Sequence, residues 1–360
     1  MALQSSGAIS LNQIHIEAGG SSGTTCSLND SDIRALIDKA SGASNAFSEY
    51  YGASASTNLS GSAGSNINGQ VQISNITVSN YISSGGTLEI PSGMWVWSNS
   101  TSTPAMTIDI PCTIINNGKI IGCGGKGGNC SYGFSGTAHV GGNGGVAINV
   151  TSSGVTITNG SGAYIAGGGG GGSTYPIFHT SGTFQQGGGG GGGGAGGGGG
   201  GTGGTRSGYG YSSSGNTAAG GVLNASGANG TYSSSNPVAG AGSGGGAGGG
   251  AGGSGGDISH QGDGGAGGRI LPGTGGSGGA ASGSKAVAGT AGGSAGNAGV
   301  NNTTSNYSGE GAGFGAGGGG GWGASGGQGR VGLQAGGTGG AAITGTSRTL
   351  SNSGTIYGST

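Results

Sequence analysis

The polar and apolar positions of the first 56 residues predict two short elements. Ile14-His15-Ile16-Glu17 alternates between apolar and polar residues, which predicts a short strand. Ile33, Leu36 and Ile37 recur at helical spacing, which predicts one short amphipathic helix over 33–40, ended by Gly42. The residues that could cap its first turn are Asn29, Asp30 and Ser31.

Three stretches of this opening unit carry a resemblance. They are SSGAISLNQIHIEAGG (5–20), the helix start NDSDIR (29–34) and FSEYYGAS (47–54). Together they resemble the opening module of many phage tail proteins, notably virion structural proteins of marine T4-like phages. The resemblance implies that residues 1–56 form a virion-docking module ahead of a variable body. A Ser/Gly/Asn-rich linker is expected over 57–66.

Residues 67–166 have the pattern of short strands. Val71, Ile73, Ile76 and Val78 are spaced as a half-buried strand with one break, and 88–97 reads as strand, turn, strand. A repeat of strand, Asn/Gly turn, short strand and glycine then occurs three times, at 105–122, 147–167 and 342–358. We therefore expect a small stacked β framework over 67–166, to which the chain returns in 341–360.

Between the last two copies, residues 167–340 are almost entirely Gly, Ala and Ser, and the glycines are partly phased in threes. A period of three matches an extended left-handed helix whose backbone groups must find partners in neighbouring helices. The expected fold is therefore mostly β, with packed glycine-rich three-fold helices of the polyglycine II type and one short N-terminal α-helix. The phased positions are 263, 266 and 269; 274, 277 and 280; 291, 294, 297 and 300; and 335, 338 and 341.

In composition and layout, roughly 165–340 resembles the tip adhesins of T-even-type phages. In those proteins glycine-rich helices pack as a sandwich and the intervening loops contact the host receptor. Those adhesins dock on a separate fibre through their own N-terminal domain, which the opening module here does not match. The resemblance thus implies a receptor-binding adhesin and leaves its mode of attachment open.

Short segments rich in Tyr, Phe, His, Ser and Asn interrupt the glycine runs. Aromatic anchors beside small hydrogen-bonding residues are typical of adaptable binding loops. The alternative for each aromatic residue is that it caps or packs a glycine helix, and this alternative is strongest for Phe314 and Trp322, which lie inside glycine runs. The candidate receptor-binding residues are Tyr175, Phe178, His179, Phe184, Arg206, Tyr209, Tyr211, Tyr232, His260 and Tyr307.

The composition limits the classes of partner that can be expected. Nine Lys and Arg residues are scattered over 360 positions and the formal net charge is −1, so nucleic-acid binding is not expected. No signal peptide pattern and no membrane-spanning apolar run is visible. We expect synthesis in the host cytoplasm and assembly into the virion tail, with other tail proteins and a host surface protein or glycan as partners. A homotrimer is possible on these data.

Catalysis and cofactors are not expected. Of ten carboxylates, only Asp257 and Asp263, beside His260, form a local pair outside the N-terminal unit, which is weak support for a polysaccharide depolymerase. The four histidines are isolated, and a metal site would need a trimer that brings copies of His15 together. The cysteines lack metal-finger spacing, and a disulfide among Cys112, Cys123 and Cys130 stays open.

Two further alternatives come from other functional classes. A purely structural fibre or baseplate component would direct the same loops towards other virion subunits. An ice-binding protein would instead need a flat face of regularly spaced small residues, which the Tyr-rich segments do not favour. Receptor-binding adhesin is the function that the sequence favours.

Overall fold

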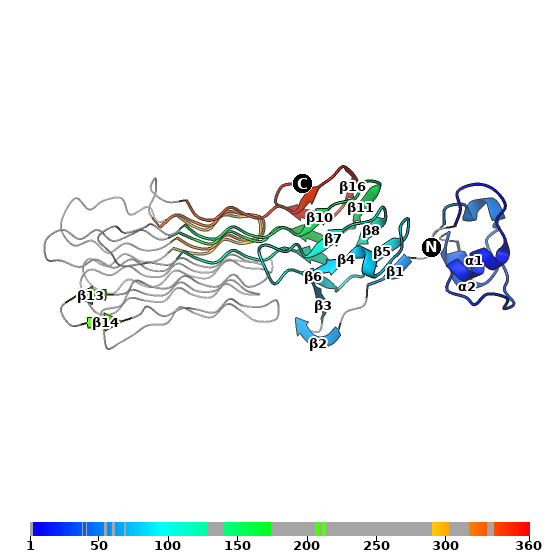
Figure 1. Ribbon diagram of the computed structural model, residues 1–360, viewed down its shortest axis with the longest axis horizontal. Helices are drawn as coiled ribbons and strands as arrows, with labels where there is room; N and C mark the ends of the chain where they lie inside the picture. The colour runs from blue at the N-terminus through cyan, green and yellow to red at the C-terminus, as the bar shows by residue number, and fades with distance from the viewer. Residues whose placement is uncertain are drawn as a thin grey trace.

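The computed structural model describes a mostly β chain with two short α-helices (Figure 1). The described residues are 3–37, 39–40, 42–53, 56–59, 62–67, 70–128, 140–173, 206–208, 211–213, 290–301, 317–329 and 335–360. A small helical unit stands at one end, a stack of parallel strands follows it, and glycine segments extend from the stack away from the helical unit (Figure 1).

The first helix, α1 (Leu11–Glu17), replaces the strand expected at 14–17, so that prediction was wrong. The Ser10 hydroxyl accepts a hydrogen bond from the Gln13 N–H, and the Gln13 side chain accepts one from the Ser10 N–H. This capping box fixes the first helical turn. Helical geometry also explains why Ile14 is fully buried whereas Ile16 is 46% exposed, since in a strand both would lie on one face.

The second helix, α2 (Ser31–Ala35), follows Asp30 at the N-cap and is shorter than expected. The Arg34 guanidinium donates hydrogen bonds to the carbonyls of Ala40 at 2.8 Å and Ala43 at 2.7 Å, which lie on either side of Gly42, where φ is 82°. A short 3-10 helix, η1 (Phe47–Tyr50), completes the unit. Its fully or nearly buried apolar side chains are Leu3, Ile14, Ile33 and Tyr50.

The strands form a parallel β-helix of three sheets. Each rung contributes one strand to each sheet, and equivalent strands of successive rungs pair in parallel. The four complete rungs within the described residues are β4 (Ile76–Thr77), β5 (Thr87–Ile90) and β6 (Trp95–Trp97); β7 (Met106–Ile108), β8 (Thr113–Asn116) and β9 (Lys119–Ile121); β10 (Ile148–Val150), β11 (Val155–Asn159) and β12 (Tyr164–Ala166); and β15 (Ile343–Gly345), β16 (Arg348–Asn352) and β17 (Thr355–Tyr357).

The interior of the β-helix is built from columns of like residues. Val96, Ile120, Ile165 and Ile356 stack in one sheet, and Leu88, Ile114, Ile157 and Leu350 stack in another. At one corner the stacked residues are amides. The Asn116 side chain donates to Asn159 at 2.8 Å, and Asn159 donates to Asn352 at 2.8 Å. This ladder satisfies polar groups that would otherwise be buried unpaired.

The three expected repeat copies are confirmed as stacked strand units. The structure adds an earlier rung over 76–97, and the run Val71 to Val78 is not one strand. The chain turns between β3 (Gln70–Ser74) and β4, where Asn75 has a φ of 50°, and these two strands belong to different sheets. Strands β1 (Ser56–Asn58) and β2 (Ser62–Ile67) overlap the segment expected as a linker. A short 3-10 helix, η2 (Val78–Asn80), follows β4.

Candidate functional site

The glycine segments leave the β-helix between consecutive rungs. Residues 122–128 and 140–146 connect β9 to β10, and residues 167–173 leave β12 on the way to β15. Because β10 and β15 pair directly, with Ile148 opposite Ile343, the chain rejoins the framework beside the rung that it left. The expected departure and return of the chain are therefore confirmed.

Residues 167–173 lie at the centre of the described glycine segments. From Ala166 onwards, successive carbonyls accept hydrogen bonds from three different neighbouring segments in turn, so every third carbonyl bonds to the same segment. Ala166, Gly169 and Gly172 accept from Gly122, Gly125 and Gly128; Gly167, Gly170 and Ser173 accept from Gly323, Gly320 and Gly317; and Gly168 and Gly171 accept from Gly340 and Gly337. These hydrogen bonds are 2.7–3.0 Å long and join backbone groups alone.

Side chains cannot be accommodated at Gly168 and Gly171 in the central segment. A Cβ atom on Gly168 would lie 1.8 Å from the Cys123 carbonyl oxygen, and one on Gly171 would lie 2.0 Å from that of Lys126. The outer segments have room for side chains on one side only. On that side, every third position is occupied by a residue other than glycine. The exposed residues at these positions include Lys126, Val140, Asn143, Ala335 and Thr338. A pure glycine run therefore marks a central position, and a triplet with two glycines marks an outer one.

Two hairpins of this body end against the β-helix. Residues 291–300 form one, because Val300 donates to Ala291 and Asn297 to Ser294, with Gly296 at a φ of 76°. The period-three positions 291, 294, 297 and 300 therefore do not lie along one continuous segment, because the chain reverses at 295–296. The second hairpin spans 318–327 and turns at Trp322–Gly323, where Gly323 has a φ of 60°.

Both hairpin tips pack on an aromatic cluster on the outside of the β-helix. Trp322 is fully buried, and its ring centroid lies 5.5 Å from Tyr164, 5.8 Å from Tyr357 and 6.5 Å from Trp95 in edge-to-face contacts. These contacts join the glycine body to strands β6, β12 and β17. The packing alternative is thus confirmed for Trp322, whereas Phe314 lies outside the described residues.

Lys119 covers the cluster from the β9 strand. Its Nζ lies 4.5 Å from the centroid of the Trp95 ring and 5.7 Å from that of Tyr164. Burial lowers the pKa of Lys119, and the aromatic faces offset part of that cost through cation–π attraction. The junction between the β-helix and the glycine body is therefore made by aromatic packing and backbone hydrogen bonds.

Most of the candidate receptor-binding residues lie outside the described residues. Those outside are Tyr175, Phe178, His179, Phe184, Tyr209, Tyr232, His260 and Tyr307. Arg206 and Tyr211 belong to two short antiparallel strands, β13 (Arg206–Gly208) and β14 (Tyr211–Ser213), with Gly208 opposite Tyr211. Figure 1 places these strands at the end of the molecule opposite the N-terminal unit.

The described residues offer little for metal, redox or nucleophile chemistry. They contain no group of three His, Cys, Asp or Glu side chains that could hold a metal ion. Cys26 and Cys112 are free thiols, and Cys130 lies outside the described residues. Burial, with a smaller contribution from Asp109, raises the pKa of Cys112 to about 11, and burial raises the pKa of Cys123 to about 11. Asp257, Asp263 and His260, the expected local pair and its neighbour, are also outside.

No helix in the described ranges combines the length and the apolarity needed to cross a membrane. The chain matches no protein-family model and no curated protein. Among solved structures, it is similar to the gp37–gp38 adhesin tip complex of the bacteriophage S16 long tail fibre. That similarity has 16% sequence identity and a TM-score of 0.37, and it covers 96% of each chain. So low a TM-score does not establish a shared fold.

Proposed function

We propose that this chain is a phage tail protein that binds the host surface through loops at the far end of its glycine body. The observation that carries the proposal is the arrangement along the molecule. The N-terminal unit stands at one end, and the strands that contain Arg206 and Tyr211 stand at the other (Figure 1). Recognition segments carried at that end would face away from the rest of the virion.

The glycine body is the support in this proposal, and we infer that it is a lattice of left-handed three-fold helices. A helix with three residues per turn directs successive carbonyls towards three different neighbours, as residues 166–173 do. No glycine of 122–128 or 167–172 has a positive φ, in agreement with the left-handed form. A rigid support of this kind would lower the entropy lost on binding.

The recognition surface would be formed by the ten candidate residues named above. Aromatic side chains are the commonest anchors of binding surfaces, and losing one costs about 2 kcal/mol or more. The absence of a strong charge, at a formal −1 for the whole chain, favours a neutral protein loop or glycan over a highly charged receptor. No catalytic step is part of this proposal.

The test is saturable binding of the labelled full chain to candidate host cells. One variant replaces Tyr209, Tyr211 and Tyr232 by Ser, and its matched control is Tyr81→Ser, an exposed tyrosine in the β-helix (36% exposed). A second variant lacks 173–186 and 206–236. We expect both loop variants to lose at least tenfold in affinity and Tyr81→Ser to retain it.

The alternative is a structural component of the fibre or baseplate, in which the same loops contact other virion subunits. This alternative would be favoured if the full chain is well folded but binds to none of the host cells to which the phage adsorbs. A polysaccharide depolymerase would instead shorten host surface glycans during the same incubation, which gel analysis of the extracted glycans detects. Either result would overturn the adhesin proposal.

A further inference from the structure

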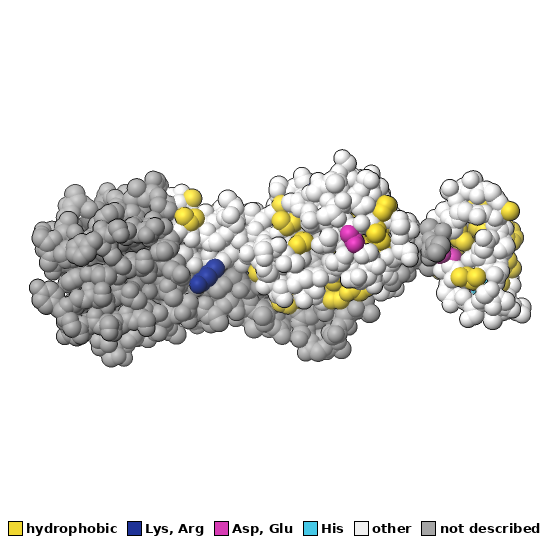
Figure 2. Space-filling model, viewed as in Figure 1, with side chains coloured by type: hydrophobic (Ala, Val, Ile, Leu, Met, Phe, Trp, Pro, Cys, Tyr) yellow, Lys and Arg dark blue, Asp and Glu magenta, His cyan; other side chains and the backbone are white. Residues whose placement is uncertain are grey.

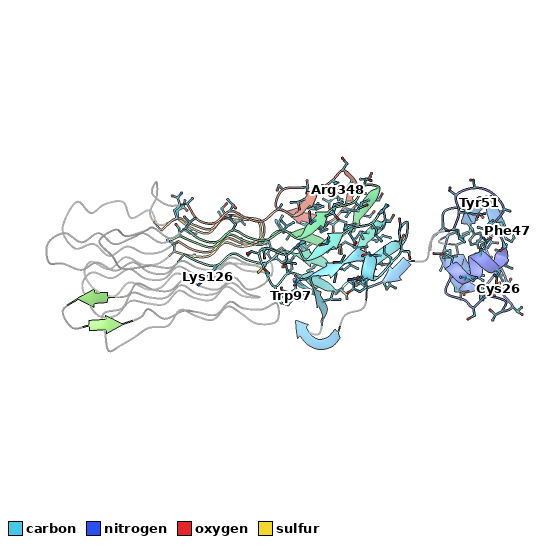
Figure 3. All side chains as sticks on the ribbon, viewed as in Figure 1. Cys26, Phe47, Tyr51, Trp97, Lys126 and Arg348 are labelled. Atoms are coloured by element: carbon cyan, nitrogen blue, oxygen red, sulfur yellow. The ribbon has the colours of Figure 1, made fainter. Side chains whose placement is uncertain are left out.

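The N-terminal unit has an apolar surface that its own fold leaves uncovered. Among the described residues, six large hydrophobic side chains are exposed, and three of them belong to this unit: Ile16 (46%), Phe47 (40%) and Tyr51 (38%). Figure 2 shows apolar atoms along the edge of the unit that faces away from the β-helix, and Figure 3 places Phe47 at that edge and Tyr51 in the upper part of the unit. Exposed apolar groups concentrated in this way mark an interaction site.

The unit also has a very small core. Four apolar side chains are buried, and eight more are only partly covered. Domains of this size usually need a disulfide, a metal or a partner for stability. Here Cys26 is a free thiol, and the described residues hold no cluster that could bind a metal. A partner is the remaining means of covering the apolar surface.

The aromatic residues of this surface are held in place before any partner binds. The Tyr51 hydroxyl donates to the Gly7 carbonyl, and the Ala46 N–H donates to Glu49 at 2.7 Å. Lys39 forms an ion pair with Glu49 and also donates to the Ser44 carbonyl at 2.6 Å. Phe47 therefore lies on a braced turn, and a braced side chain loses little entropy on docking.

The charge of the unit indicates what kind of surface covers it. Residues 3–53 contain five acidic residues (Glu17, Asp30, Asp32, Asp38 and Glu49) and two basic ones (Arg34 and Lys39), a formal charge of −3. Arg34 is buried and donates to neutral oxygens, and Lys39 is paired with Glu49, so neither offers a free positive charge. Two copies of this unit would repel each other, whereas a basic surface would be attracted.

We propose that the exposed apolar residues Phe47, Tyr51 and Ile16 of the N-terminal unit dock this chain onto a different tail protein whose contact surface is apolar and carries Lys or Arg residues. This proposal rests on the proposed function as a virion protein. It adds which residues make the attachment, and it excludes a second copy of the chain as the occupant. A contact of ordinary size, about 800 Å² on each side, would cover roughly a quarter of such a small unit.

The experiment measures the copies of the full chain per purified virion in phages that carry edited genes. The variants are Phe47→Ser, Ile16→Ser and their combination, and the matched control is Val140→Ser, which removes an equally exposed apolar side chain from the glycine body. We expect at least a tenfold loss of virion copies in the double variant and none in the control. Thermal melting of each purified variant separates lost docking from lost folding.

A further variant, Asp32→Lys, tests the charge of the partner. We expect fewer copies per virion, and the difference from the unsubstituted chain should shrink when assembly takes place at high salt. Unchanged incorporation of a folded double variant would overturn the proposal. So would a purified full chain that is a dimer and becomes a monomer on Phe47→Ser, because the occupant would then be a second copy.

Host-cell binding by the same purified proteins separates this proposal from the proposed function. Loss of virion copies with unchanged cell binding supports both. Loss of virion copies in a chain that binds no host cell supports the docking surface and overturns the adhesin. Absence of the unsubstituted chain from purified virions overturns both.

Discussion

Replacing Gly168 by Ala should destabilise the glycine body far more than the same replacement at Gly142. The new Cβ at 168 would lie 1.8 Å from the Cys123 carbonyl oxygen and 2.4 Å from its carbon, all backbone atoms that no rotamer change can move aside. Carbon and oxygen in contact lie roughly 3.3 Å apart, so the two segments must separate by about 1.5 Å. At Gly142 the nearest atom is the Lys126 nitrogen at 3.0 Å, and the residue is exposed.

A separation of that size breaks the hydrogen bonds from Gly122, Gly125 and Gly128 to the central segment, which are 2.8 Å long. Each hydrogen bond contributes about 1 kcal/mol to the free energy of unfolding. Replacing Gly by Ala also stabilises the protein by about 0.4–1 kcal/mol, because it lowers the conformational entropy of the unfolded chain. The net loss is therefore about 2–3 kcal/mol for Gly168→Ala, against about zero for Gly142→Ala. Urea unfolding of both variants measures the difference, and hydrogen exchange by mass spectrometry locates it. Equal stabilities, within about 0.5 kcal/mol, would refute the close-packed arrangement.

Three further outcomes follow from other parts of the structure. Asn159→Ala removes the middle of the buried amide ladder and should cost about 2–3 kcal/mol in urea unfolding, whereas Asn352→Ala at the exposed end should cost less than about 1 kcal/mol. Trp322→Ala should cost about 3–5 kcal/mol and abolish the near-ultraviolet circular dichroism of the aromatic cluster, whereas Trp322→Phe should retain most of both. Burial raises the pKa of Cys112 from 9.0 to about 11. The unfolded chain therefore releases this proton at a lower pH than the folded chain, and the free energy of unfolding should fall as the pH rises from 9 to 11. The fall should be smaller in Cys112→Ala, and a free energy of unfolding that does not change over this range in the unsubstituted protein would contradict the raised pKa.

The β framework was readable from the sequence because each rung repeats the same local signals. Alternating residues such as Val155 to Asn159 predict the strands, and Asn followed by Gly marks the corners. The amide ladder was not foreseen, since the pairing of Asn116, Asn159 and Asn352 depends on register across as many as 193 residues. The strand, turn, strand pattern predicted at 88–97 is confirmed by β5 and β6, but the sequence did not show that 76–97 is a rung of the same repeat, because the corner at Asn75 breaks the pattern without a glycine.

The sequence pattern gave a wrong prediction where the same residues fit the periodicity of two different structures. Ile14 and Ile16 fit a strand, and the helix became visible only through the Ser10 and Gln13 cap. In 291–300, a spacing of three holds on both arms of a hairpin, so the spacing alone does not reveal the turn at Gly296. Eight of the ten candidate recognition residues lie outside the described residues. Their composition indicates a binding role, but their mutual positions depend on tertiary packing that composition does not encode.

The described part of the glycine body is held together mainly by backbone groups, unlike an ordinary apolar core. Its backbone hydrogen bonds recur every third residue and set the spacing between segments, and a few side chains, such as Ser173 and Asn143, add hydrogen bonds between them. Side chains appear where a segment faces solvent, as at Lys126 and Val140, and where a hairpin tip meets the β-helix, as at Trp322. Under the proposed function, a receptor-binding surface carried on this support could change its specificity without disturbing the described backbone contacts, which an adhesin under selection by a changing host requires.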